Sequence, residues 1–338
     1  MIDLAEEWRK LDAVRHKPDA QEHWDKRART FSFHDAPNDY VSSFIRKMQL
    51  QGGESILDMG CGTGSLAVPL ARAGHAVVAA DFSQGMLERV RENAAGLLVE
   101  GAQASSVPGS LGSGLASALG GTGAEAVSTQ SRRSAVLLSG HVDRDESPAR
   151  CRMAQLPPGK VLPLQMSWES NWEEHGLPAN SVDVAIASRS IITHDLEDSI
   201  TKLSAVAKKR VCVTAGTGVS PRVDERVARA MGLQLERHND ALFVFGIASA
   251  LGFEPTVSYI RSPRTKTYSS PEEAYHSLMK TLDYVDDHAS QVSTEVAAAR
   301  LREWLQQHLV QASAEGGGEL WALDAPRVVP WAFISWET

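Results

Sequence analysis

The sequence predicts a doubly wound α/β domain, and three observations support this fold class. Short apolar segments that end in Asp58 and Asp81 alternate with segments of helical periodicity. A glycine-rich turn joins the first of these strands to the first helix. Hydrophobic residues make up 43% of the 338 residues and charged residues 22%, which is typical of a chain that buries a packed core.

The first half of the predicted sheet is compact in sequence. A strand at 55–58 enters the glycine-rich turn, and a helix follows at 65–73. The second strand lies at 75–80, and Ser83 is placed to cap a helix at 84–95. The order strand, helix, strand, helix favours parallel strands with a right-handed crossover.

A low-complexity segment at 101–158 interrupts this alternation. Gly, Ala and Ser dominate its first part, where Glu125 is the only charged side chain between 101 and 130. Such a composition buries too little apolar side chain to offset the entropy lost on ordering. We therefore predict a flexible insertion between a helix and the third strand.

After Lys160 the alternation resumes and completes a sheet of seven strands. The five remaining strands are expected at 161–166, 181–188, 210–214, 256–260 and 327–336. Helices at 196–208 and 240–251 separate some of them. Helical patterns at 271–285 and 294–312, between the last two strands, predict an added helical subdomain.

This pattern divides the chain into five parts. They are an N-terminal helical segment at 1–50, the α/β core at 51–100 and 159–260, the insertion at 101–158, the helical subdomain at 261–315, and the closing strand at 316–338.

The glycine-rich turn is the most informative motif. It reads DMGCGTG from Asp58 to Gly64, and Asp81 ends the next strand. Glycines let the backbone turn tightly and approach a ligand closely. An acid at the end of the second strand can accept hydrogen bonds from two ribose hydroxyls. The motif therefore predicts nucleoside binding.

A nicotinamide dinucleotide enzyme is the first alternative, because its G-x-G-x-x-G pattern occupies the same turn. Here the glycines alternate at Gly60, Gly62 and Gly64, and Asp58 stands on the strand just before them. That acid would repel a pyrophosphate, which favours a helix N-terminus free of negative charge. S-adenosylmethionine (SAM) has no phosphate and carries an ammonium group, so it fits the turn better.

The run ILDMGCGTGSLAVPLARAGHAVVAADFSQGML, Ile56 to Leu87, resembles the class I SAM-dependent methyltransferases, especially the small-molecule type related to the ubiquinone and menaquinone enzymes. The resemblance implies a doubly wound, Rossmann-like methyltransferase sheet of seven strands with SAM as cofactor. It implies that Asp58 and the loop backbone hold the methionine end of SAM and that Asp81 binds the ribose. The full implied set is Asp58, Gly60, Cys61, Gly62, Gly64, Asp81, and, near the adenine, Phe82 and Met86.

Two further segments are compared with the same family. Trp24, Arg27, Ala28 and Phe31 resemble a W-x-x-R-A-x-x-F/Y segment that forms a helical lid in many such enzymes; the alternative is a surface helix that covers core. After strand three, the family usually carries an acid and a small residue, but this chain has Trp168 there. Trp168 is a candidate to stack on the adenine, or Glu169 to accept its exocyclic amine, and core packing of Trp168 is the alternative.

The end of strand four faces the position where the family places the transferable methyl. Ser188 is a candidate cofactor contact, and Arg189 a candidate to hold an anionic substrate group, or else to pair with Glu169 or Asp195. His194 and Asp195 are candidates for a general base. Because methyl transfer from SAM is an in-line displacement on an activated donor, positioning alone is the alternative.

Charge and cysteine content restrict the function further. The net charge of −8 works against nucleic acid as a partner, which draws affinity from Lys and Arg. Three cysteines, Cys61, Cys151 and Cys212, without C-x-x-C spacing predict neither a disulfide framework nor a metal site. No signal-peptide pattern and no apolar run of roughly 18 residues occurs, so we expect a cytoplasmic protein without a membrane span.

The leading hypothesis is methyl transfer from SAM to a small-molecule acceptor, with release of S-adenosylhomocysteine. The second is methylation of tRNA or protein, which the net charge and the sequence S-R-S-I in place of an N-P-P-[YF] motif after strand four disfavour. The third is a non-catalytic SAM-binding sensor or partner subunit. The sequence does not indicate the oligomeric state.

Overall fold

The computed structural model describes residues 3–15, 21–28, 38–99, 156–235, 237–284, 292–313 and 319–338. The predicted insertion at 101–158 lies outside these stretches except for 156–158. Phe31 and the side chain of Arg27, both from the predicted lid motif, also lie outside the description.

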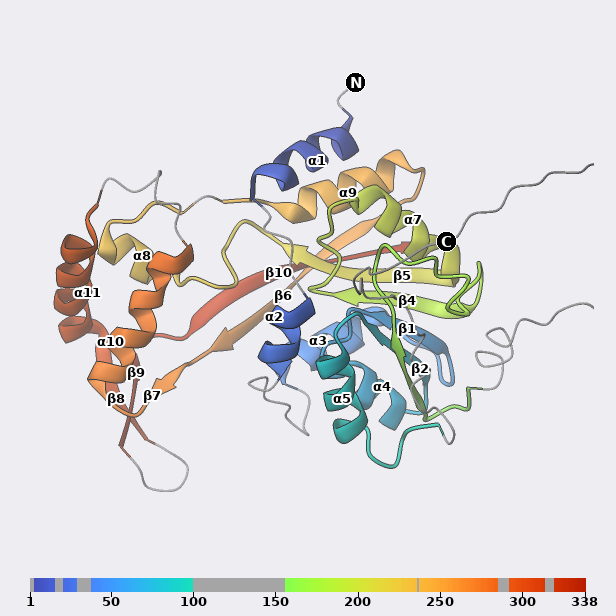
Figure 1. The fold of residues 1–338 in the computed structure, drawn as a ribbon, viewed down its shortest axis with the longest axis horizontal. Helices are drawn as coiled ribbons and strands as arrows, with labels where there is room; N and C mark the ends of the chain where they lie inside the picture. The colour runs from blue at the N-terminus through green and yellow to red at the C-terminus, as the bar shows by residue number, and fades with distance from the viewer. Residues whose placement is uncertain are drawn as a thin grey trace, which may run out of the picture.

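A seven-stranded sheet with the order β3-β2-β1-β4-β5-β10-β6 forms the centre of the larger part of the molecule (Figure 1). Its strands are β1 (Ser55–Met59), β2 (Ala76–Asp81), β3 (Val161–Gln165), β4 (Val182–Ser188), β5 (Ala207–Gly216), β6 (Thr256–Arg264) and β10 (Arg327–Glu337). β1 to β5 are parallel, whereas β10 is antiparallel to β5 and β6. The predicted sheet of seven strands is confirmed.

The strand order changes direction at β1, because β2 and β3 lie on one side of it and β4 and β5 on the other. The loops that follow β1 and β4 therefore open at the same edge of the sheet, beside each other. In open α/β sheets, ligands bind at this kind of switch point.

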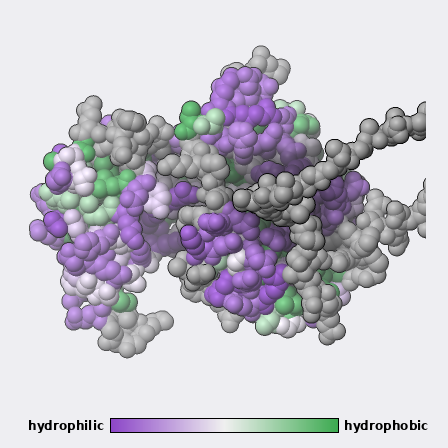
Figure 2. All heavy atoms as spheres, viewed as in Figure 1, coloured by the Kyte–Doolittle hydropathy of each residue, from purple (hydrophilic) through white to green (hydrophobic). Residues whose placement is uncertain are grey.

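Helices cover both faces of the sheet, as the doubly wound prediction requires. One face carries α3 (Asp39–Met48), α4 (Ala67–Arg72) and α5 (Gln84–Asn93). The other face carries α1 (Leu4–Arg15), α7 (Leu196–Val206) and α9 (Asp240–Ala250). Successive strand residues alternate between the two cores, so Ile56 packs under α3 and α4 and Leu57 packs on the opposite side. Figure 2 shows hydrophilic outer surfaces over α1 and α5, as expected for covering helices.

A smaller unit lies at the far end of the long β6–β10 ribbon (Figure 1). Its helices are α8 (Glu225–Met231), α10 (Pro271–Met279), the 3-10 helix η1 (Lys280–Tyr284) and α11 (Thr294–His308). A three-stranded antiparallel sheet accompanies them, with the order β7 (Thr267–Tyr268), β9 (Glu319–Leu323) and β8 (Leu309–Ser313). The unit has its own core, in which Val227, Tyr275 and Leu301 are buried together.

This smaller unit differs from the helical subdomain expected from the sequence. The expected helix at 294–312 ends at His308, and the residues after it form β8 because Leu309 is extended and pairs with Leu323. α8, which falls in the segment expected to belong to the core, packs on α11 instead. Similarly, α7 ends at Val206 and not at 208, since Ala207 is already extended and begins β5.

None of the described helices combines the length and the apolar composition that crossing a lipid bilayer requires.

Candidate functional site

The loop after β1 is shaped by its glycines. Gly60 and Gly64 have φ angles of 71° and 83°, a region that residues with a side chain rarely adopt. A Cβ atom at Gly60 would lie 2.4 Å from Cβ of Ser190, so the loop after β4 can approach the glycine loop this closely only because Gly60 has no side chain. A Cβ atom at Gly62 would meet no heavy atom within 4 Å, which leaves the loop open at that point.

Asp58, at the end of β1, is a buried acid with an unused hydrogen-bonding atom. The residue is 1% exposed, and its Oδ2 has no hydrogen-bond partner among the residues that the structure describes. Burial raises its pKa to about 7, and the nearby charge of Asp81 adds to the rise. A buried carboxylate oxygen without a partner is costly. The site therefore fits a ligand group that donates hydrogen bonds or carries positive charge.

Asp81 closes the other side of the glycine loop. Its Oδ2 accepts a hydrogen bond of 2.9 Å from the Gly62 amide, and its Oδ1 accepts one of 2.9 Å from the Ser83 amide. Burial raises the pKa of Asp81, and these two hydrogen bonds oppose the rise. Each carboxylate oxygen can accept a second hydrogen bond. Asp58, Asp81 and the loop from Gly60 to Gly64, hereafter the acidic cradle, thus lie together at the switch point.

The helix α2 (Gln21–Ala28) is tied to this cradle through Asp25. Asp25 Oδ1 accepts hydrogen bonds from Ser83 Oγ at 2.5 Å and from the Gly85 amide at 3.0 Å. The contact brings a carboxylate to the N-terminus of α5, where the helix dipole stabilises it. A Cβ atom at Gly85 would lie 3.1 Å from Cα of Asp25, so the close approach uses this glycine. Sequence reasoning named Trp24 and Ala28 in this segment and missed Asp25.

The residues expected near the adenine lie on two elements. Met86, on α5, is buried, and Phe82 is half-buried with its carbonyl accepting a hydrogen bond from Gln165. Trp168 is half-buried and lies against Trp172, with ring centroids 5.6 Å apart. Trp168 therefore makes the core contact that was the alternative interpretation, and its stacking on adenine stays a prediction.

The end of β4 is held by a group of side chains that sequence reasoning mostly missed. The Tyr40 hydroxyl is 2.8 Å from Ser188 Oγ and 2.8 Å from Thr214 Oγ1. Arg189 has a φ of 62°, and its guanidinium lies over the Tyr40 ring at 4.4 Å and near the Trp331 ring at 5.9 Å. Tyr40 and Trp331 come from α3 and β10, so no local sequence signal links them to Arg189.

This end of β4 touches the acidic cradle. Ser190 Oγ donates a hydrogen bond of 2.6 Å to the Met59 carbonyl, and its Cβ packs on Gly60. Arg189 is the preceding residue. The structure therefore places Arg189 next to a residue that contacts the glycine loop, and the roles expected for Ser188 and Arg189 stay predictions.

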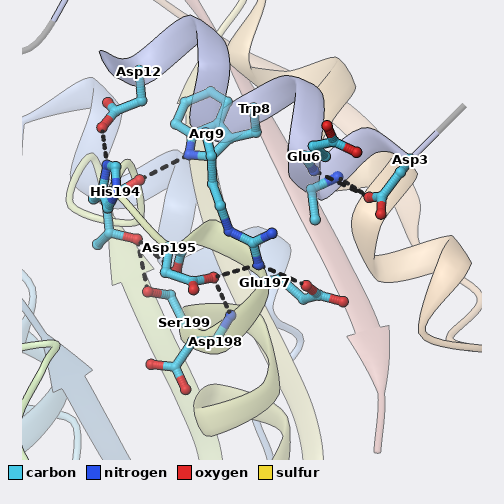
Figure 3. Close-up of polar contacts among 12 residues, drawn as sticks. Asp3, Glu6, Trp8, Arg9, Asp12, His194, Asp195, Glu197, Asp198 and Ser199 are labelled. Atoms are coloured by element: carbon cyan, nitrogen blue, oxygen red, sulfur yellow. Dashed lines mark hydrogen bonds and ion pairs between the residues drawn. The ribbon is translucent and has the colours of Figure 1, made fainter.

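His194 and Asp195 bind the N-terminal helix α1 (Figure 3). His194 Nδ1 is 2.8 Å from Asp12 Oδ2, and the His194 side chain is 71% exposed. Asp195 caps α7 by accepting a hydrogen bond from the Asp198 amide, and it also pairs with Arg9. The predicted alternative of an Arg189 ion pair with Asp195 is not seen. The role of His194 as a general base stays a prediction.

The described cysteines are buried. Burial raises the pKa of the Cys61 thiol well above its usual range, so the thiol stays protonated inside the loop. Cys151 lies outside the described residues. Within the described stretches, no three His, Cys, Asp or Glu side chains gather as metal ligands would.

Residues 56–111, which include the glycine loop and Asp81, match a family model described as a methyltransferase domain. These residues therefore carry a methyltransferase domain, in agreement with the resemblance to SAM-dependent methyltransferases found in the sequence.

Two relatives span different lengths of the chain. An uncharacterised protein of Haemophilus influenzae is 26% identical over 265 residues, which are 77% of this chain and 73% of that protein. A demethylmenaquinone methyltransferase of Clavibacter sepedonicus is 57% identical over 44 residues, which are 13% of this chain and 18% of that enzyme. Among solved structures, the YcgJ protein of Bacillus subtilis is similar with a TM-score of 0.43 and 11% identity, covering 88% of this chain and 97% of that one.

Proposed function

We propose that this methyltransferase domain transfers the methyl group of SAM to a small-molecule acceptor and releases S-adenosylhomocysteine. The observation that carries the proposal is Asp58, whose Oδ2 is buried without a partner beside an open glycine loop. SAM carries an ammonium group, and an ionised Asp58 would pair with it. The same carboxylate would repel the pyrophosphate of a dinucleotide.

Each part of the acidic cradle has a role in this proposal. Asp58 accepts hydrogen bonds from the amino group of the cofactor, and the loop backbone at Gly62 leaves room for its methionine end. Asp81 keeps its bonds to Gly62 and Ser83 and uses its remaining lone pairs for the ribose hydroxyls. When bound, SAM supplies a methyl group on a positively charged sulfur, so the chain needs to supply orientation and exclusion of water.

On the acceptor side, Tyr40, Arg189 and Trp331 lie together at the end of β4. Burial raises the pKa of Tyr40, so its hydroxyl remains protonated and bridges Ser188 and Thr214. These contacts fix the end of β4, which is where a small acceptor would meet the methyl group. A net charge of −8 supports a small acceptor over tRNA.

Calorimetric titration with SAM, S-adenosylhomocysteine and NADH tests the cofactor assignment. We expect both adenosyl ligands to bind and NADH not to bind. Asp81→Asn should weaken adenosyl binding by about tenfold, because one charge-assisted hydrogen bond to the ribose is lost. Asp198→Asn, at the exposed start of α7, is the matched control and should leave binding unchanged. Binding of NADH without binding of either adenosyl ligand would refute the proposal.

A radiolabelled methyl group on SAM tests the acceptor class. The purified protein is incubated with total tRNA, with a protein extract and with a set of small acids, phenols and amines. We expect label in a small molecule only. Label in tRNA or protein would support the second hypothesis, and binding of SAM without transfer to any acceptor would support a sensor.

A further inference from the structure

The β6–β10 ribbon carries one face that continues from the end of β4 toward the smaller unit. Trp331 pairs with Ile260, and Arg327 pairs with Arg264 four residues further along the ribbon. Directly opposed residues in an antiparallel pair point to the same side, and so does every second residue along a strand. Arg264 therefore shares a face with Trp331, which is the residue that Arg189 approaches.

Arg189 and Arg264 lie near each other without a counter-charge. Partial burial lowers the pKa of Arg264, and the positive charge of Arg189 lowers it further. Across the stretches of the chain that the structure describes, neither guanidinium forms an ion pair or a hydrogen bond. By contrast, Arg226 pairs with Asp224, and Arg327 donates to the carbonyls of Ser220 and Val223. In a chain with a net charge of −8, two unpaired neighbouring arginines are unusual.

The geometry of Arg189 leaves its donors available. The Arg189 guanidinium carbon lies 4.4 Å from the centroid of the Tyr40 ring, and within the described stretches the guanidinium N–H groups make no hydrogen bond. The in-plane N–H groups of an arginine match the oxygens of a carboxylate or a phosphate. Ser262, between Ile260 and Arg264 on the same face, has a buried Oγ without a hydrogen-bond partner and can add a further donor.

We infer that the methyl acceptor is an oxyanion, a small molecule whose carboxylate or phosphate group is bound by Arg189 and Arg264. This inference rests on the proposed function and adds the chemical class of the acceptor. Arg189 directly precedes Ser190, which packs on Gly60, so an anion held here lies next to the glycine loop. The remainder of the acceptor then points toward the transferable methyl.

Calorimetric titration with benzoate, benzamide and inorganic phosphate tests this inference, with and without saturating S-adenosylhomocysteine. We expect benzoate or phosphate to bind and benzamide not to bind; which anion binds more tightly distinguishes carboxylate from phosphate. Arg189→Gln and Arg264→Gln should each weaken binding by about tenfold, the loss expected for one charge-assisted hydrogen bond.

Arg261→Gln is the matched control. Arg261 lies on the same strand as Arg264 but on the other face, stacked on Tyr259 with 5.1 Å between guanidinium and ring. The inference is overturned if neither anion binds, or if Arg261→Gln weakens binding as much as Arg264→Gln does. Titration of S-adenosylhomocysteine alone distinguishes failure of the proposed function from failure of the anion site. If S-adenosylhomocysteine does not bind, the proposed function is contradicted, and the anion titrations still test Arg189 and Arg264.

Discussion

The two sides of the switch point carry opposite charge. On the β1–β2 side, Asp58 and Asp81 lie at the glycine loop, and Asp25 accepts a hydrogen bond from Ser83 nearby. On the β4–β6 side, Arg189 follows β4 and Arg264 ends β6. A cofactor that is positively charged and an acceptor that is negatively charged would each find a complementary surface. Charge alone would then direct each ligand to its own side of the sheet edge before any contact specific to either ligand forms.

The contact between Gly60 and Ser190 joins these two regions, and breaking it should have the largest effect. We expect Gly60→Ala to lower the free energy of unfolding by about 3 kcal/mol, because the new Cβ overlaps Ser190 and the φ angle is strained. Gly62→Ala, with a φ of 56° and no neighbour within 4 Å, should cost about 1 kcal/mol. Urea denaturation measures both. Equal losses for the two variants would show that the close approach does not exist.

Removing the charge of Asp58 should affect ligand binding on the acidic side only. Asp58→Asn is expected to weaken binding of S-adenosylhomocysteine by about 100-fold, because a buried ammonium would lose its counter-charge. Binding of benzoate or phosphate at the arginines should change little. Calorimetry measures both on the same sample. Unchanged adenosyl affinity would contradict the role given to Asp58.

The raised pKa of Asp58 makes the acidic side sensitive to pH. The pKa of Asp58 is about 7 in the folded protein, compared with 3.8 for an ordinary aspartate side chain. Binding of an ammonium requires the ionised form, so the affinity for S-adenosylhomocysteine should fall by about tenfold for each pH unit below 7. Calorimetry in buffers of different ionisation enthalpy should detect the proton that Asp58 releases. If the affinity stays constant from pH 7 down to pH 5, about two units below this pKa, Asp58 does not bind the ammonium in its ionised form.

The raised pKa of Asp58 also makes the free energy of unfolding depend on pH. Between about pH 4 and pH 7 the folded protein retains a proton that the unfolded chain has lost, so the contribution of Asp58 to the free energy of unfolding decreases as pH rises through this window. The Asp58→Asn variant lacks this contribution. The difference between the two proteins in urea denaturation, followed across the window, isolates it from other titrating groups.

The acidic cradle was predictable from sequence because it is local. Asp58, the glycines and Asp81 lie within one strand-turn-helix-strand unit, where spacing alone determines that they meet. The arginine side is assembled from α3, β4, β6 and β10, which are distant in sequence. Arg189 was identified from its position after β4, but its partners Tyr40 and Trp331 depend on tertiary packing that no periodicity encodes.

Two elements of the smaller unit, β8 and α8, differ from the sequence prediction for the same physical reason. The residues after His308 have helical spacing of apolar side chains, yet they form β8 because β9 offers a pairing partner in the folded chain. The sequence analysis assigns the range 159–260 to the core, but the buried face of α8, within that range, packs on α11. Local patterns predict the existence of elements well, whereas the partner that an apolar face selects is a tertiary property.

The smallest expected effect concerns His194, whose position after β4 suggested a general base. Its bond to Asp12 leaves the side chain 71% exposed, so His194→Ala should lower the free energy of unfolding by less than about 1 kcal/mol and leave methyl transfer unchanged. Arg9→Gln is the control, because it removes another anchor of α1, the pairing of Arg9 with Asp195 and Glu197, and leaves the His194 imidazole in place. If transfer falls by about 100-fold in His194→Ala alone, His194 is the base and not an anchor of α1.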